Sequence, residues 1–339
     1  MKKVGLPRAL LYYKFSELWI TFFKVLGTEV IISPLTNKSI KENSIRIAPN
    51  EDCFSTKLYY GHVMFLKDKV DYLFIPRFGS KHKTNSGCPK FIGLSDVLKS
   101  MFPDLPEIIN PYYSTAKAGH GKFHLFKLAF KIGLIFTKNP FRILHAISTA
   151  IISYKEHQKQ IHLSEETLSN WENSNLILNP KLTNHKEEQP LKIALAAHSY
   201  ILNDQIASLE IVKKLELLGI DIITSEQMPI SIIEEQMNNL EFNLFFDFER
   251  EILGTIMYFL EQKTIDGIIH IIIFSCGPDS IAGEMAAYFS MENYPMHFLQ
   301  LTFDELTGDA GLMTRLEAFV DMIRMEKRPI KAKMPVNII

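Results

Sequence analysis

The sequence predicts an α/β fold in which two doubly wound parallel-sheet domains flank a helical segment. Short apolar runs rich in β-branched residues alternate with segments of helical period in both terminal thirds of the chain. The middle third, from residue 111 to about 175, has helical period without strand-like alternation. We therefore expect a first domain at residues 1–110, a helical segment and linker at residues 111–190, and a second domain at residues 191–339.

In the first domain, prolines mark the ends of strands, because proline has no backbone N–H to donate to a neighbouring strand. Pro7, Pro34 and Pro76 each follow a short apolar run. Strands are expected at residues 3–6, 28–33, 71–75 and 107–109, and helices at residues 12–26, 40–48, 51–69 and 91–101. Residues 77–90 lack an apolar period, which predicts a long loop that is functional or disordered.

The second domain repeats this alternation of strands and helices. Strands are expected at residues 193–197, 220–224, 266–274 and 295–301, and helices at residues 205–218, 231–240, 245–262, from about 281, and at 311–325. The helix at 245–262 is amphipathic, so Glu249, Glu251 and Glu261 are expected on its solvated face.

The middle segment is basic in its first half, with aromatic residues interleaved and a break at Asn139-Pro140. We favour a helical layer with a solvated face over a phosphate-binding or membrane surface. The polar stretch at 179–190 is expected to be a linker or an exposed loop. The basic residues are Lys117, His120, Lys122, His124, Lys127, Lys131, Lys138 and Arg142.

The composition of the 339-residue chain excludes several classes of protein. A net charge of −1 gives no basic excess for a nucleic-acid partner. No run is long and apolar enough to cross a bilayer, and the first residues lack the apolar core of a signal peptide, so neither a membrane nor secretion is expected. Three cysteines form no disulfide framework and fit a reducing cytoplasm.

The apolar run at 268–274, interrupted only by His270, reads as a buried strand that delivers Cys276 to a strand-to-helix turn. Asp279 or Ser280 is expected to cap the helix that follows. Amides and the helix dipole at such a turn favour a thiolate, which binds metals or attacks electrophiles. A small buried cysteine at a tight turn is the alternative, and it is the commoner case.

All three cysteines can face one crevice between the domains, because sites in open α/β sheets form beyond the carboxyl ends of the strands. Cys88 lies in the long loop and Cys53 at the start of a helix, which usually begins on the same edge. The spacing of the cysteines matches no compact zinc motif. Neither a Walker A sequence, a dinucleotide glycine fingerprint nor a G-x-S-x-G elbow is present.

Several segments together resemble the 2-hydroxyacyl-CoA dehydratase superfamily, in its activase-related DUF2229 branch. The similarity extends from about residue 4 to about residue 325 and is weakest in the middle helical segment. It is carried by Gly5 to Tyr13, Ser33 to Lys38, Glu51-Asp52-Cys53, Gly61-His62-Val63, Asp71 to Arg77, Cys88 to Phe91, Cys276 to Ser280 and Asp304 to Leu312.

The resemblance implies two Rossmann-like domains that hold an iron–sulfur cluster in the cleft between them. Its three motif cysteines, Cys53, Cys88 and Cys276, become the expected ligands of a 4Fe–4S cluster with one open iron. A bridged double-cubane 8Fe–9S cluster across a homodimer is the alternative. Residues expected to contact the cofactor or substrate are Arg8, Thr36, Asn37, His62 and Lys90, for which turn chemistry and surface charge are the structural explanation.

The resemblance also implies an electron acceptor, fed with low-potential electrons by a separate ATP-dependent activase that carries its own iron–sulfur cluster. The reaction would be dehydration of an acyl-CoA by a lyase or reduction of a small molecule by a reductase. A non-catalytic accessory subunit that binds a cluster or CoA, and an α/β protein with structural cysteines, are the alternatives. Two departures bear on the reaction: Ser55 replaces a proline of many relatives, and Leu306 replaces a histidine.

Overall fold

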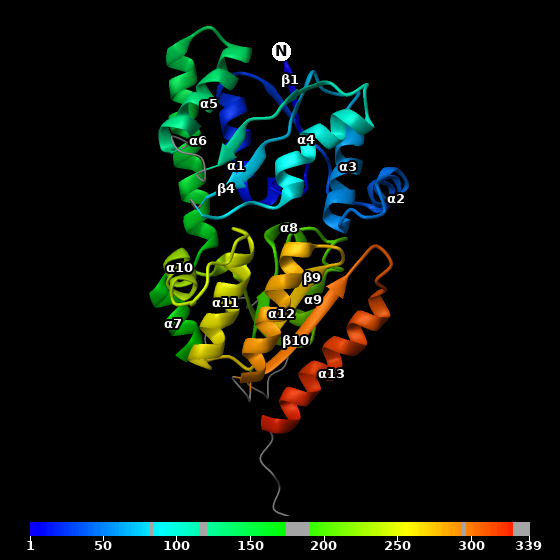
Figure 1. The fold of residues 1–339 in the computed structure, drawn as a ribbon, viewed down its shortest axis with the longest axis vertical. Helices are drawn as coiled ribbons and strands as arrows, with labels where there is room; N and C mark the ends of the chain where they lie inside the picture. Colours follow the sequence, from blue (N-terminus) through cyan, green and yellow to red (C-terminus); the bar gives the residue numbers. More distant parts are fainter. Residues whose placement is uncertain (82–83, 115–120, 174–189, 293–295, 328–339) are drawn as a thin grey trace, which may run out of the picture.

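The computed structural model describes residues 1–81, 84–114, 121–173, 190–292 and 296–327 (Figure 1). Residues 179–189 of the expected linker lie outside this range, as do the basic residues Lys117 and His120. The described chain is a mixed α/β structure whose strands all pair in parallel. The expectation of an α/β fold with parallel sheets is therefore confirmed.

The first sheet contains four of the expected strands in the order β2-β1-β3-β5. Each strand lies within a residue or two of its predicted position, because proline or a polar turn ends the apolar run. The strands are β1 (Lys3–Leu6), β2 (Glu29–Ile32), β3 (Tyr72–Phe74) and β5 (Glu107–Ile109).

The second sheet has the order β10-β9-β7-β8. In each sheet, the strand that comes first in the chain lies between the second and the third, and the fourth lies beyond the third. The two sheets therefore share one topology, although no sequence repeat relates them. In this topology the strand order reverses beside the first strand, which is where ligands bind in such folds. The strands are β7 (Leu191–Ala196), β8 (Ile220–Thr224), β9 (Gly267–Ile273) and β10 (His297–Phe303).

Helices cover both faces of the first sheet. Helices α3 and α4 pack on one face in a cluster that includes Val63, Leu73 and Leu98, while α1 and α6 pack on the other against Phe74. Gly27 ends the α1 region with a φ of 81°, as its position predicts. The helices here are α1 (Tyr12–Val25), α2 (Lys38–Ile47), α3 (Phe54–Leu66) and α4 (Pro89–Met101).

The middle segment is helical, as expected, and breaks at Asn139, whose side chain accepts hydrogen bonds from the next helix. It forms α5 (Lys122–Phe136), α6 (Pro140–Ile161) and α7 (Glu165–Asn173). Figure 1 shows α6 running beside both sheets. Trp171 of α7 is buried in the core of the second sheet, so this segment ties the two halves of the chain together.

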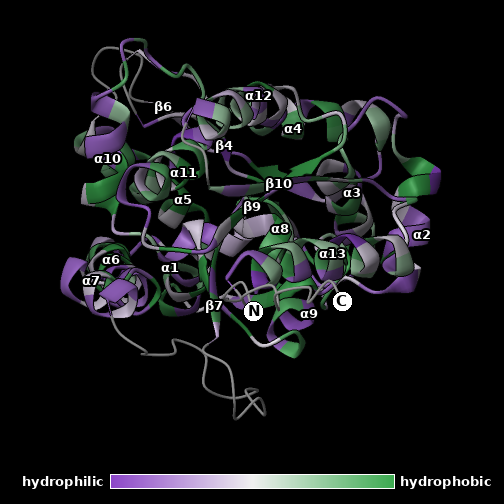
Figure 2. Ribbon diagram, turned by 90° about the horizontal axis from the view of Figure 1, so that it is seen from below, coloured by the Kyte–Doolittle hydropathy of each residue, from purple (hydrophilic) through white to green (hydrophobic). Residues whose placement is uncertain are grey.

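The second sheet is also covered on both faces, with α11 and α12 on one side and α9 and α13 on the other (Figure 2). Strands β7, β8 and β9 are almost fully buried, which explains why their sequences are largely apolar runs. The helices are α8 (Ser199–Leu202), α9 (Ile211–Leu217), α10 (Ile230–Asn238), α11 (Glu249–Gln262), α12 (Gly277–Glu292) and α13 (Asp309–Lys327).

Three sequence predictions about elements are wrong. The expected loop at 77–90 contains β4 (Arg77–Ser80), which pairs with β6 (Tyr112–Ser114) in a small parallel sheet. Helix α9 begins later than expected, because Leu209 and Glu210 adopt positive φ values that interrupt it. Helix α12 begins directly after Cys276, since Ser275 has a φ of 65° and turns the chain at once.

The two sheets meet through the carboxyl ends of their strands. Residues that follow β1, β2 and β7 contact each other there, as shown by hydrogen bonds from Tyr13 and Thr36 to Asp204. Phe54 of α3 belongs to the hydrophobic core of the second sheet, and Phe248 belongs to that of the first. The junction is therefore packed and apolar as well as polar.

Candidate functional site

Each of the three cysteines immediately precedes a long helix at the junction of the sheets. Cys53 and Cys88 are the N-terminal caps of α3 and α4, and Cys276 directly precedes α12. Helix N-termini present unpaired backbone N–H groups, which stabilise a negative ligand. The expectation that the cysteines lie at helix starts is confirmed for Cys53 and Cys276, and Cys88 shares the arrangement.

Direct contacts tie the three cysteine turns to one another. Lys90, two residues after Cys88, forms an ion pair with Asp52, which precedes Cys53. Ser275 donates a hydrogen bond of 3.4 Å from its hydroxyl to the backbone carbonyl of Glu51. The turns before α3, α4 and α12 therefore converge, although they lie in three distant parts of the sequence.

Tyr200 lies at the centre of this convergence. Its ring stacks on His198 at 4.8 Å between centroids and meets Phe91 edge-on at 6.1 Å. Burial raises the pKa of Tyr200 well above its usual value, and negative charge on each of the three cysteines would raise it further. No sequence pattern singles out this tyrosine, because the residues that surround it come from both halves of the chain.

Backbone N–H groups at the helix starts favour a thiolate at Cys88 and Cys276, as expected, but burial outweighs them. Burial raises the pKa of Cys88 to about 11, although the backbone N–H groups of Lys90 and Phe91 point at its sulfur and oppose this shift. Burial and the carboxylate of Asp279 also raise the pKa of Cys276. Because no cation offsets the loss of water in either case, these thiols deprotonate only when a positive group arrives among them.

Cys53 raises the pKa of Cys88 and of Cys276, so its thiol lies near each of the other two. Nevertheless, within the described part of the chain no three His, Cys, Asp or Glu side chains come near enough to bind one metal ion. Ligands of a single ion crowd one point, whereas the cysteines of a cluster each bind a different iron and lie farther apart. Three thiols are nevertheless the type of donor that iron–sulfur clusters use.

A buried cluster of ionisable side chains lies next to the cysteines. His198 Nε2 is 3.7 Å from Glu249 Oε1 and 3.9 Å from Asp279 Oδ2, and His270 Nε2 is 3.3 Å from Asp279 Oδ1. Each of the four residues has a buried atom without a hydrogen-bond partner: His198 Nε2, Glu249 Oε2, His270 Nδ1 and Asp279 Oδ2. We call these four residues the His–carboxylate cluster.

Sequence reasoning missed the His–carboxylate cluster. Glu249 is only 2% exposed, so its expected place on a solvated helix face is wrong, and burial beside Asp279 raises its pKa to about 8. Asp279 was expected only as a helix cap, but it is fully buried. His270, the one polar residue of an apolar strand, was the signal that could have revealed the cluster.

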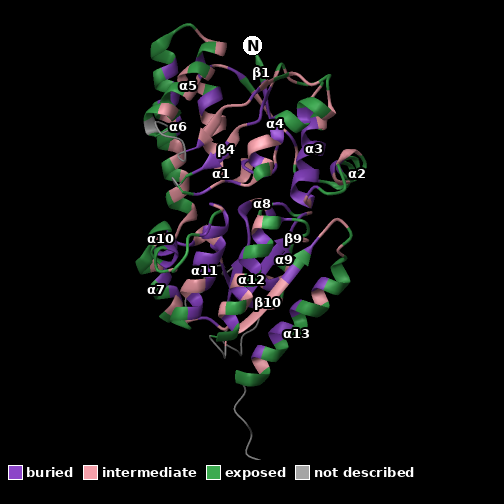
Figure 3. Cartoon of the chain, viewed as in Figure 1, coloured by how far each residue is buried: buried purple, intermediate pink, exposed green. Residues whose placement is uncertain are grey.

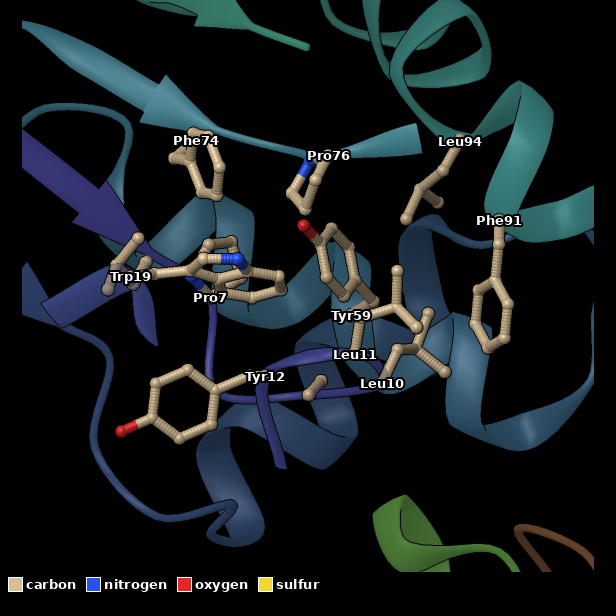
Figure 4. Close-up of a pocket in the computed structure, with 12 residues that line it drawn as sticks. Pro7, Leu10, Leu11, Tyr12, Trp19, Tyr59, Phe74, Pro76, Phe91 and Leu94 are labelled. Carbon is tan, nitrogen blue, oxygen red and sulfur yellow. The ribbon is translucent and has the colours of Figure 1, made fainter. Parts of the chain in front are cut away.

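Two small cavities lie near the junction. One, of about 10 Å³, lies beside the candidate site and is lined by His198, Tyr200 and Glu251 among others. Figure 4 shows the other, of the same volume, among apolar side chains that include Pro7, Tyr59 and Phe91. Each is about the size of one water molecule, and no cysteine lines either of them.

Two of the residues expected to contact a cofactor lie in a separate hydrogen-bond network. His62 is fully buried, with Nδ1 2.9 Å from Ser33 Oγ and Nε2 3.0 Å from Thr36 Oγ1. Thr36 in turn donates to Asp204. Burial, with a smaller effect from Arg8, lowers the pKa of His62 to about 3, so the ring is neutral. We call Ser33, Thr36, His62 and Asp204 the hydroxyl–histidine network.

The other three residues have mixed roles. Asn37 caps α2 by accepting a hydrogen bond of 3.1 Å from the backbone N–H of Ile40, which is the turn chemistry given above as the alternative to a cofactor contact. Lys90 links two cysteine turns through Asp52. Arg8 stacks over the ring of Tyr12 at 5.7 Å, and its buried Nε has no hydrogen-bond partner. Arg8 is thus the one of the three whose side chain retains an unmet polar group.

The two departures from the family pattern also lie at the junction. Ser55 is buried in the first turn of α3, and its hydroxyl has no hydrogen-bond partner. Leu306 is 86% exposed in a turn that Asp304 fixes by accepting hydrogen bonds from Leu306 N and Thr307 Oγ1. Next to it, Glu305 pairs with Lys57 of α3 at 2.6 Å.

The parallel sheets and the cysteine turns at their carboxyl edges define an α/β protein with a thiol-rich site at a junction. Residues 3–228 match the family model described as CoA enzyme activase uncharacterised domain (DUF2229), and the chain belongs to this family. The match includes Cys53 and Cys88 but ends before Cys276. A comparison with curated proteins gives no match. Across the described ranges, every helix is too short or too polar to span a membrane.

Proposed function

We propose that the chain is an iron–sulfur protein in which Cys53, Cys88 and Cys276 bind a 4Fe–4S cluster and leave one iron open. The observation that carries this proposal is the convergence of the three cysteine-bearing helix starts, tied together by Lys90–Asp52 and Ser275–Glu51 contacts. The chain holds no fourth cysteine to close the site. When bound, such a cluster supplies one-electron chemistry and an iron that accepts a small ligand.

The protein's own residues would control protons and water around that cluster. Tyr200 keeps its phenolic proton and lies close enough to all three cysteines for their charge to affect it, so it is a candidate to donate a hydrogen bond to a ligand held there. Glu249, with a pKa of about 8, holds a proton close by. A reductive elimination of water needs a proton at the leaving hydroxyl, and these two groups are suited to provide it.

The family description, CoA enzyme activase, supports a partnership with an enzyme that acts on CoA substrates. We propose that this chain accepts low-potential electrons from a separate ATP-dependent activase, since its sequence carries no nucleotide-binding motif. Large apolar side chains around the Cys276 turn are exposed and offer a docking place: Phe274, Ile281 and Leu306.

The test is iron and acid-labile sulfide per chain after anaerobic reconstitution. About four of each per chain are expected for a single cluster, and about eight irons with nine sulfides per dimer for the bridged 8Fe–9S form. Cys53→Ser, Cys88→Ser and Cys276→Ser should each remove most of the iron. Ser280→Ala is the matched control, because Ser280 bonds only the backbone carbonyl of Cys276.

The outcomes separate the alternatives. Full iron retained in one cysteine variant would remove that residue from the ligand set. A cluster that an ATP-fuelled activase cannot reduce would favour the non-catalytic accessory subunit. Absence of iron after reconstitution, with all three cysteine variants as stable as the wild type, would leave structural cysteines as the explanation.

A further inference from the structure

The outer side of the α5–α6 pair exposes an unusual number of large apolar side chains. Figure 3 shows exposed residues recurring along both helices. Phe123 is 68% exposed and Phe141 79% exposed. We call this region the hairpin surface; its exposed apolar residues are Phe123, Leu125, Phe126, Leu134, Phe141, Leu144, Ile151 and Ile152.

The fold does not need these side chains. The inner sides of the two helices already fill the core of the first sheet, through Phe136 and Ile135 of α5 and Ile143 and Ala146 of α6. A Cβ on Gly133 would lie 2.6 Å from the side chain of Ile143, so the two helices approach closely at this glycine. None of the exposed residues belongs to this core, and scattered exposure alone would not place so many on one pair of helices.

The hairpin surface is also positively charged. No aspartate or glutamate occurs from residue 108 to residue 155. Along α5, Phe123, Lys127, Lys131 and Leu134 share one exposed stripe at helical spacing, and the ammonium of Lys127 lies 4.6 Å from the centre of the Phe123 ring. Further exposed cations follow at Lys138, Arg142 and Lys155.

We propose that the hairpin surface docks on an anionic phospholipid membrane. Aromatic and aliphatic side chains enter the boundary between headgroups and acyl chains, while lysine and arginine are attracted to anionic lipids. Protein–protein interfaces instead deplete lysine from their apolar centres, so the mixture of lysine and phenylalanine favours lipid over a protein partner. This reverses the expectation of a solvated face and no membrane partner. The docking is independent of the proposed cluster.

The experiment is co-sedimentation of the full chain with vesicles. Binding is expected with vesicles of phosphatidylcholine mixed with phosphatidylglycerol, and it should weaken in high salt and be absent with phosphatidylcholine alone. Lys127→Glu with Lys131→Glu should weaken binding at least about tenfold, since each lysine near the surface contributes about 1 kcal/mol. Phe123→Ser with Phe141→Ser should weaken it to a similar extent.

The matched control is Lys213→Glu with Leu217→Ser on α9, which changes an exposed lysine and an exposed leucine elsewhere. It should bind like the wild type. The proposal is overturned if anionic vesicles do not bind, if neutral vesicles bind equally, or if the hairpin variants bind unchanged. Self-association that the hairpin variants abolish, without vesicle binding, would assign the surface to a second copy of the chain instead.

Discussion

Two buried polar clusters lie at the junction of the sheets, and they differ in how completely their hydrogen bonds are made. In the hydroxyl–histidine network, no side chain is left with an unpartnered buried atom. His62 bonds Ser33 and Thr36, and Asp204 accepts from Thr36 and from the backbone N–H groups of Ile206 and Ala207. In the His–carboxylate cluster, each of the four side chains retains an unpartnered buried atom.

From this difference we infer that the hydroxyl–histidine network supports the fold and that the His–carboxylate cluster is the better candidate for a binding or reacting site. A satisfied network holds the chain in one arrangement and has no free donor or acceptor for a ligand. An unsatisfied cluster carries a free-energy cost that folding alone does not explain, and such groups concentrate at sites that bind or react. The His–carboxylate cluster also lies beside the cysteines, through Asp279 in the first turn of α12. The hydroxyl–histidine network is instead centred on α3 and the α8 region.

The largest expected effect comes from breaking the satisfied network. Asp204→Ala removes acceptors from Thr36 and two backbone N–H groups and leaves them buried, so we expect a loss of about 3 kcal/mol in the free energy of unfolding. Denaturant unfolding of the iron-free protein measures it. Asp279→Asn is the matched variant, since it also changes a buried aspartate. It should cost much less, because asparagine keeps an oxygen for His270 and Asp279 Oδ2 has no hydrogen-bond partner to lose.

Equal losses in the two variants would contradict the comparison, because they would mean that both clusters serve folding in the same way.

A smaller effect depends on pH. The pKa of Glu249 is raised from 4.5 to about 8 by burial, so the folded protein keeps a proton that the unfolded chain has lost between these values. The folded state therefore binds more protons in this window, and stability falls as pH rises from about 4.5 through 8. In Glu249→Gln this slope should be absent, and above pH 8 the variant should be more stable by on the order of 5 kcal/mol.

The measurement is the free energy of unfolding of both proteins across that pH range. Glu261→Gln is the control, because it removes a carboxylate from the same helix without changing the cluster. A parallel pH dependence in wild type and Glu249→Gln would show that Glu249 titrates normally.

Most of the fold follows from local sequence. Pro7 and Pro76 end strands β1 and β3 by chemistry that no distant contact alters, and Gly27 ends a helix for the same reason. The strand β4 could not be predicted, because its four residues become a strand only by pairing with β6, which lies more than thirty residues away.

The candidate site follows from the sequence only in part. Cys53 and Cys276 could be placed at helix starts from the residues around them, as for Cys276-Gly277-Pro278, whereas Cys88 was expected in a loop. Tyr200 and Glu249 could not be placed, because their burial depends on how the two sheets meet. An amphipathic pattern identifies the apolar face of α11, but it cannot show that a glutamate at the start of that helix is buried beside His198 and Asp279.

The finest test of the comparison is spectroscopic and concerns His62. Because Thr36 donates to Asp204, His62 Nε2 must carry the proton given to Thr36, and Nδ1 must accept from Ser33. With its pKa lowered to about 3 by burial, the folded protein binds fewer protons than the unfolded chain below 6.5, so this stability is complete above 6.5 and is lost as pH falls toward 3.

Nitrogen chemical shifts from NMR should therefore show His62 as the neutral Nε2–H tautomer, unchanged between about pH 8 and about pH 5. The His62→Gln variant assigns the resonance by its disappearance. A ring that titrates within this range, or that carries its proton on Nδ1, would mean that water reaches the network. The hydroxyl–histidine network and the His–carboxylate cluster would then differ in the types of side chain they contain, and not in how completely their hydrogen bonds are made.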